Sequence, residues 1–263
     1  MRIEIRLNGY DDFFKQIVDL KSKYNRETAI GNRELKNRIA SASVEEFLNS
    51  GFTVGVSGSQ FLAMQKLPLS FYLRSDVVTI AKELLGKILV TNWNGEYTSG
   101  RIVETEAYAG ETDKASHASK GRTSRTEVMF NEGGTAYVYL CYGIHQMFNI
   151  VTNKEGRPDA VLIRGIEPVA GMDIMLKRTG KKKMDETLTR GPGNVGKAFG
   201  FHTSQCGLSL AGDELFIADD GYKISKSMIV ASPRIGVDYA GKHAEWHYRF
   251  YLKGSKYVSG RVK

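Results

Sequence analysis

The sequence predicts an α+β protein built around a curved, mostly antiparallel β-sheet. Two hairpin signals support this prediction: Asn94-Gly95 stands between two strand-like runs, and Tyr142-Gly143 stands between two more. The order of the segments supports it too, because strand-like and helix-like stretches come in groups and not in strict βαβ alternation. Such grouping favours antiparallel pairing over a parallel sheet.

Length and composition restrict the class of protein. The chain has 263 residues, of which 41% are apolar, which suits one domain with an appendage or two small domains. It contains no run of eighteen apolar residues, and its N-terminus lacks a secretory apolar region, so we expect an intracellular protein. Cys141 and Cys206 stand alone, without CxxC or metal-ligand spacing. We therefore expect no structural zinc and no disulfide framework.

The N-terminal part of the chain differs in texture from the rest. Apolar residues recur at helical spacing in residues 11–25 and again in residues 42–52. Residues 53–60 are rich in glycine and serine, which is typical of a linker. We therefore predict an extension of unknown role over residues 1–66 and a main domain over residues 67–263.

The main domain begins with a helix and a hairpin. Ser75 is a plausible N-cap for a helix whose apolar residues follow at helical spacing, and Gly86 would end it. Residues 87–108 then give two strands around Asn94-Gly95. The remaining elements expected are a second hairpin over 135–153, a strand over 160–169, helices over 170–180 and 195–201, and strands within 213–220 and 249–259.

The second strand of the first hairpin is acidic in a basic chain. Alternate residues of a strand share a face, so Glu104 and Glu106 point the same way as Ile102 and Tyr108. A solvated strand face is the ordinary explanation for such carboxylates, and a catalytic carboxylate inside a cationic cleft is the alternative. His117 follows closely, but a single histidine is more often structural than catalytic.

The second hairpin places large apolar groups at its turn. Tyr142 and Ile144 would stand exposed at the tip, where they could wedge into a base stack, unless the tip packs against the core. Tyr137, Tyr139 and Asn149 lie on the same hairpin and could stack on a base or bond to it.

Positive charge exceeds negative charge over the whole chain. The formal net charge is +8, which attracts a polyanion such as nucleic acid or serves solubility alone. The cations that could meet phosphates are Arg122, Arg125, Lys181, Lys182, Lys183 and Lys197.

Five blocks together resemble one family. "GRIVETEAYAGETDKASHASKGRT", "MFNEGGTAYVYLCYGIHQMFNIVTN", "AVLIRGIEP", "RGPGNVGKAFG" and "PRIGVDYAGKHAEWHYRFYLKGSKYVS" are similar to the alkyladenine (3-methyladenine, or methylpurine) DNA glycosylases. The resemblance runs from about Leu69 to the C-terminus and does not cover the N-terminal extension. It implies one compact α+β domain with a curved, barrel-like antiparallel sheet, flanking helices and a protruding hairpin that intercalates into DNA.

The resemblance also implies the catalytic residues. Glu106 matches the catalytic carboxylate, and Arg164 matches the arginine that helps to hold the attacking water. The carboxylate would deprotonate that water and stabilise an oxocarbenium-like sugar, while the arginine keeps it ionised. Glu104 is then expected to be structural, and Glu111 and Asp113 are expected to lie in a solvated loop.

The base pocket and the wedge follow from the same blocks. Tyr108, His117 and Tyr139 match the residues that enclose and stack on the flipped base. Asn149 matches the asparagine that opposes the 2-amino group of guanine, and Leu162 falls on an apolar pocket position. Tyr142 matches the intercalating tyrosine, and Ile144 stands where some members carry methionine. An aromatic pocket would favour cationic alkylated purines by cation–π attraction.

The function implied is DNA repair by a monofunctional glycosylase that needs no metal and no cofactor. The expected substrate is double-stranded DNA with a damaged purine of the 3-methyladenine, 7-methylguanine or hypoxanthine type, which is flipped out and released to leave an abasic site. A monomer suffices for one flipped base, no membrane is involved, and the location would be the bacterial cytoplasm at the nucleoid or the eukaryotic nucleus. Two other readings are a non-catalytic nucleic-acid-binding module and a small-molecule enzyme such as a nucleoside hydrolase or a formyltransferase-type domain.

Overall fold

The sheet is antiparallel throughout. The computed structural model describes residues 64–260, which contain nine paired strands in the order β1-β7-β2-β3-β6-β5-β4, with β9 pairing both β3 and β8. Their bounds are β1 (Gln65–Lys66), β2 (Ile88–Trp93), β3 (Glu96–Tyr108), β4 (Ala136–Cys141), β5 (His145–Thr152), β6 (Asp159–Ala170), β7 (Leu215–Asp219), β8 (Ile229–Ser232) and β9 (Arg249–Leu252). The α+β class is confirmed, whereas the path of strands ends at β1 and β4 and leaves the barrel-like closure unconfirmed.

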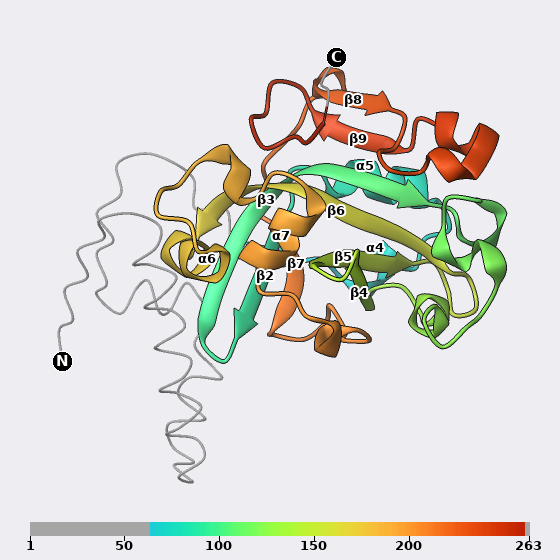
Figure 1. Cartoon of the computed structure of the whole chain (residues 1–263), viewed down its shortest axis with the longest axis horizontal. Helices are drawn as coiled ribbons and strands as arrows, with labels where there is room; N and C mark the ends of the chain where they lie inside the picture. Colours follow the sequence, from blue (N-terminus) through green and yellow to red (C-terminus); the bar gives the residue numbers. More distant parts are fainter. Residues whose placement is uncertain (1–63, 261–263) are drawn as a thin grey trace, which may run out of the picture. The chain divides into compact units, whose positions relative to one another are not determined.

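Helices are few and short among the described residues. The α-helices are α4 (Leu69–Tyr72), α5 (Val77–Leu84), α6 (Met172–Thr179) and α7 (Pro192–Ala198), and several 3₁₀ turns join the strands. β3 and β6 run side by side through the middle of the sheet (Figure 1). Within residues 64–260, no helix combines the length and the apolar character that crossing a bilayer requires.

The first hairpin forms as its turn chemistry predicts. Trp93 pairs with Glu96, and Asn94 and Gly95 adopt φ values of 54° and 86° between them. Positive φ at both central positions is the type I′ requirement that Asn-Gly meets at little cost. This hairpin sets β2 against β3, and β3 carries the acidic residues.

The second hairpin has a slightly longer turn. Cys141 pairs with His145, so the connection comprises Tyr142, Gly143 and Ile144. Tyr142 adopts a φ of 51°, which is unusual for an aromatic residue, and Gly143 follows with a φ of 73°. The predicted turn position is therefore confirmed, and Ile144 belongs to the turn as well.

Helix α5 begins one residue later than the sequence suggested. We expected Ser75 as the N-cap, but Asp76 caps the helix: its carboxylate accepts a hydrogen bond of 3.0 Å from the Thr79 amide. A carboxylate at this position also complements the positive end of the helix. Gly86 adopts a φ of 82° just beyond the end of α5, as expected.

Helix α7 packs closely on the first residues of β5, next to the turn of the second hairpin. A Cβ atom added at Gly196 would lie 1.9 Å from the backbone oxygen of Gln146, so no other residue fits there without moving the helix. Phe148 of β5 also stacks on Phe201, with ring centroids 4.1 Å apart. The hairpin is thus packed against the main core through β5, while Tyr142 and Ile144 in its turn are exposed.

Several predicted elements differ from the structure in their bounds, and some strands were not predicted. The 249–259 strand is shorter, at Arg249–Leu252, and β1 and β8 were not predicted. The helices expected in 11–25 and 42–52 lie outside the described residues. The boundary between residues 66 and 67 stays a prediction, although β1, just before it, pairs with β7.

Candidate active site

One face of four adjacent strands carries the candidate residues. Directly paired residues of an antiparallel sheet share a face, and the pairing register forms a continuous row across the sheet. In this row Tyr137 of β4 pairs with Asn149 of β5, Asn149 with Leu162 of β6, and Leu162 with Glu106 of β3. Residues two positions away share that face, which brings Tyr139, Arg164 and Tyr108 alongside.

The two carboxylates of β3 are fully buried. Glu104 and Glu106 have no exposed surface, so the solvated strand face considered from the sequence is wrong. β3 is an inner strand that pairs with β2, β6 and β9, and its register against β6 shifts on both sides of Glu104. Such irregularities re-aim side chains, and they are common beside active sites.

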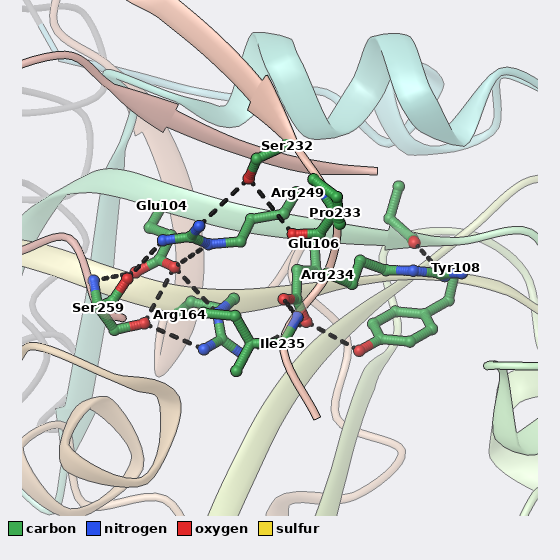
Figure 2. Close-up of polar contacts among 11 residues, drawn as sticks. Glu104, Glu106, Tyr108, Arg164, Ser232, Pro233, Arg234, Ile235, Arg249 and Ser259 are labelled. Carbon is green, nitrogen blue, oxygen red and sulfur yellow. Dashed lines mark hydrogen bonds and ion pairs between the residues drawn. The ribbon is translucent and has the colours of Figure 1, made fainter. Parts of the chain in front are cut away.

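Glu106 is held by three donors (Figure 2). The Tyr108 hydroxyl donates to Oε2 at 2.9 Å, and Arg164 Nη1 donates to the same oxygen at 3.3 Å. The backbone amide of Ile235 donates to Oε1 at 2.8 Å. Three donors and an adjacent cation suit an ionised carboxylate, and Oε1 keeps capacity for a further donor such as water.

Arg164 is fixed at all three guanidinium nitrogens. Besides its bond to Glu106, its Nε donates to Glu104 at 3.0 Å and its Nη2 donates to the Ser259 hydroxyl at 3.0 Å. Burial alone would lower the pKa of this guanidinium, but the charges of Glu106 and Glu104 outweigh burial and raise it. Arg164 is therefore a permanent cation in one orientation.

Glu104 connects Arg164 to a second arginine and to the C-terminal segment. Its Oε1 accepts from Arg249 Nε at 2.7 Å and from the Ser259 hydroxyl at 3.0 Å, in addition to Arg164. Its Oε2 accepts from the Ser259 amide at 2.7 Å. These four donors occupy the carboxylate, which supports a structural role for Glu104 in place of a chemical one.

A second buried ion pair lies beside this network. Asp113, which we expected in a solvated loop, is fully buried and pairs with Arg234, whose Nη2 donates to Oδ1 at 2.9 Å. The Arg234 guanidinium lies 4.8 Å from the centroid of the Tyr108 ring. Because Arg234 directly precedes Ile235, this ion pair fixes the segment whose amide donates to Glu106, and it lies against the Tyr108 ring. Glu111, in contrast, is exposed as expected.

A pocket of about 510 Å³ opens beside Glu106. Its lining includes the predicted residues Tyr108, His117, Tyr139, Tyr142, Asn149, Leu162 and Arg164, and residues that we did not predict for it, among them Arg125, Ile235 and Tyr239. Glu106 lies just behind this lining, because Tyr108, Arg164 and Ile235 are both its donors and part of the wall.

Aromatic rings form one wall of the pocket. The rings of His117 and Tyr139 meet edge to face with centroids 4.6 Å apart, and Tyr137 lies 5.4 Å from Tyr139. Burial, and secondarily the charge of Arg125, lowers the pKa of His117 to about 4, so this ring is neutral at pH 7. Burial likewise raises the pKa of Tyr139 far above its usual range. The wall therefore offers neutral π faces.

Asn149 is buried and hydrogen-bonded, whereas the residues of the hairpin turn are exposed. Asn149 is buried and its amide nitrogen donates to the backbone oxygen of Tyr137 at 3.2 Å, which fixes its orientation. Tyr142 is 89% exposed and Ile144 is 74% exposed, so the alternative of a tip packed against the core is wrong. Ile144 does not line the pocket.

The sequence offered little signal for the residues that support the site. Arg234 and Asp113 are 121 positions apart, and Ser259 meets Glu104 from 155 positions away. Ile235 contributes only a backbone amide, which side-chain identity does not reveal. These contacts depend on how the C-terminal segments meet β3, which no local pattern encodes.

Comparison with known proteins gives one consistent result. The family model described as methylpurine-DNA glycosylase matches residues 70–256. A protein of Clostridium acetobutylicum is 44% identical over 202 residues, which cover 74% of this chain and 97% of that protein. A protein of Methanocella arvoryzae is 47% identical over 200 residues, covering 76% and 98%. Both carry the name "Putative 3-methyladenine DNA glycosylase".

Proposed function

The chain belongs to the methylpurine-DNA glycosylase family, a family of DNA-repair enzymes that act on alkylated bases, and we propose how this chain carries out base release. Its substrate is double-stranded DNA with an alkylated or deaminated purine, of the 3-methyladenine, 7-methylguanine or hypoxanthine type. The purine is flipped out, and the bond between base and sugar is hydrolysed. The observation that carries the proposal is the buried Glu106–Arg164 pair directly behind an aromatic pocket.

Extrusion of the nucleotide comes first. No side chain reaches the glycosidic bond inside a stacked duplex, and flipping costs a few kcal/mol, less for a damaged or mispaired base. Tyr142 and Ile144 are exposed at the end of an anchored hairpin, which suits insertion into the vacated stack. The protruding hairpin therefore acts as the intercalating element.

The extruded base then enters the pocket. Tyr108, His117 and Tyr139 supply neutral rings, and each base–aromatic stack contributes about 1–3 kcal/mol. Leu162 gives an apolar contact on the floor. Asn149, whose amide is held by the Tyr137 backbone, opposes the 2-amino group of normal guanine.

Hydrolysis depends on Glu106. A water that donates to Oε1 is deprotonated by the carboxylate and attacks C1′ of the sugar, while the bond to the purine breaks. The negative charge also stabilises the oxocarbenium-like sugar. Arg164 keeps the carboxylate ionised and oriented, and Tyr108 and Arg164 occupy Oε2, which directs the water to Oε1.

The reaction leaves an abasic site and an intact strand. A glycosylase that also cuts the strand uses an amine to form a Schiff base, and the described pocket lining contains no lysine. No step requires a metal, because the carboxylate activates the water directly. One site acts on one flipped base, so a monomer suffices.

The competing reading is a nucleic-acid-binding module without chemistry. Such a module would use the wedge and the basic surface, but it would have no need of two fully buried carboxylates paired with Arg164. Burying such charges costs several kcal/mol for each ion before pairing, which is difficult to explain without a chemical use.

A base-release assay tests the proposal. The whole protein is incubated without added metal with a duplex that carries one hypoxanthine or one 7-methylguanine, and strand breaks are measured with and without hot alkali. We expect breaks only after alkali, because the product is an abasic site. No release from either duplex would leave the binding-module reading, and breaks without alkali would contradict the monofunctional reaction.

A further inference from the structure

Arg125 is a cation at the aromatic wall of the pocket. It is exposed, it lines the pocket, and its guanidinium carbon lies 5.3 Å from the centroid of the Tyr139 ring. This is within the range of a cation–π contact. The ring on which a flipped base would stack thus already interacts with a positive charge of the protein.

The charge of Arg125 is not balanced locally. Arg125 and Arg164 are the charged residues of the described pocket lining, and Arg164 is compensated by Glu104 and Glu106. No carboxylate within residues 64–260 forms an ion pair with Arg125. The nearby Arg122 differs, because it pairs with Glu127 at 3.2 Å and lies over the Phe130 ring outside the pocket.

Two neighbouring groups show that this charge acts on the pocket. Burial, and secondarily the positive charge of Arg125, lowers the pKa of His117; burial raises the pKa of Tyr137, and the charge of Arg125 opposes that rise. Both rings therefore experience a positive potential. A purine with a positive charge of its own would experience the same potential.

From this placement we propose that Arg125 is a specificity-determining residue, which disfavours cationic purines and favours neutral damaged purines in the pocket. The inference rests on the proposed function and concerns the same site. A cationic base such as 7-methylguanine gains cation–π attraction from the aromatic wall but is repelled by Arg125. A neutral base such as hypoxanthine stacks on the same wall without that repulsion. The attraction that we expected from an aromatic pocket is thus opposed by a cation of the protein.

The alternative role for Arg125 is a contact to a DNA phosphate. A phosphate contact adds affinity regardless of which base is flipped, and its loss makes the dependence of binding on salt less steep. A charge that acts on the base changes kcat/KM for a cationic lesion and for a neutral lesion by different factors. The ratio of activities on two lesions in the same duplex separates these roles, because contributions from phosphates cancel in it.

The experiment measures kcat/KM for 7-methylguanine and for hypoxanthine at one position of one duplex. The proteins are wild type, Arg125→Gln, which removes the charge, Arg125→Lys, which keeps it, and Arg122→Gln as the matched control. We expect Arg125→Gln to raise the ratio of 7-methylguanine to hypoxanthine by about tenfold, as for two partly screened charges several ångströms apart. Arg125→Lys and Arg122→Gln should keep the wild-type ratio.

Two results would overturn the inference while the proposed function stands. If Arg125→Gln lowers both activities equally and the salt dependence becomes less steep, Arg125 is a phosphate contact. If the ratio of 7-methylguanine to hypoxanthine activity falls in Arg125→Gln, Arg125 favours the cationic base, which is the opposite of the inference. A wild-type protein that releases neither base would instead refute the proposed function itself.

Discussion

Replacing Glu104 with glutamine should destabilise the protein strongly, although the two side chains have nearly the same shape. Glu104 is fully buried and receives four donors, two from the guanidinium groups of Arg164 and Arg249 and two from Ser259. Glutamine removes the negative charge between the two arginines. Whichever way its amide lies, an NH₂ group then faces a donor that Glu104 accepted from.

The size of the effect follows from the buried ion pairs. Removing one partner of such a pair costs about 3–5 kcal/mol, because the remaining charge is left uncompensated. Here Arg164 would keep its ion pair with Glu106, whereas Arg249 would lose the carboxylate with which it pairs. We therefore expect the free energy of unfolding to fall by about 3–5 kcal/mol, a large part of the 5–15 kcal/mol typical of a folded protein.

Equilibrium unfolding in urea measures this change, with Glu111→Gln as the control. Glu111 is an exposed carboxylate a few residues further along the chain, and its replacement should change the free energy by no more than about 0.5 kcal/mol. A loss below about 1 kcal/mol in Glu104→Gln would show that the network around Arg164 does not depend on this charge.

Three further predictions concern insertion of the hairpin turn into DNA, the exclusion of normal guanine and the dependence of the protein's stability on pH. Tyr142→Ala should weaken binding to a duplex with one hypoxanthine by about 1–3 kcal/mol, the value of one base–aromatic stack, and equal affinity in a fluorescence titration would exclude insertion of the tip. Asn149→Ser should release normal guanine from undamaged duplex; a product profile identical to wild type would remove the exclusion role. The pKa of His117 is lowered from 6.5 to about 4 in the folded protein, so the unfolded chain binds a proton first as the pH falls. Stability should therefore be lost between about pH 6.5 and pH 4, by at most about 3 kcal/mol, and His117→Phe should remove that part of the loss; parallel curves of stability against pH would contradict it.

The elements that local chemistry determines were predictable from the sequence. Asn94-Gly95 between two strands favours a type I′ turn, and the structure has positive φ at both positions. The helix that contains Gly196 was also predicted, but its close approach to the β5 backbone was not. The helix before the first hairpin was predicted, but its cap was assigned to Ser75 instead of Asp76, since both residue types serve as caps.

The burial of the acidic strand was not predictable from the strand alone. An alternating pattern distinguishes a buried face from a solvated one only when one face meets water, and β3 is covered on both faces. The resemblance to the glycosylases pointed to Glu106 and Arg164 as candidate catalytic residues, but not to the Arg234–Asp113 pair or Ser259 beside them. Those residues come from distant segments whose meeting depends on the whole sheet.

The most direct test of the account is the single-turnover rate of base release by Glu106→Gln, measured beside its affinity for the same lesion-containing duplex. The account predicts that affinity stays close to wild type, because Tyr142 and the aromatic wall are unchanged. It predicts that the rate falls by at least about 10²–10⁴, the contribution of a general base. A rate equal to wild type at equal affinity would show that Glu106 does not activate the water, and the central claim would fail.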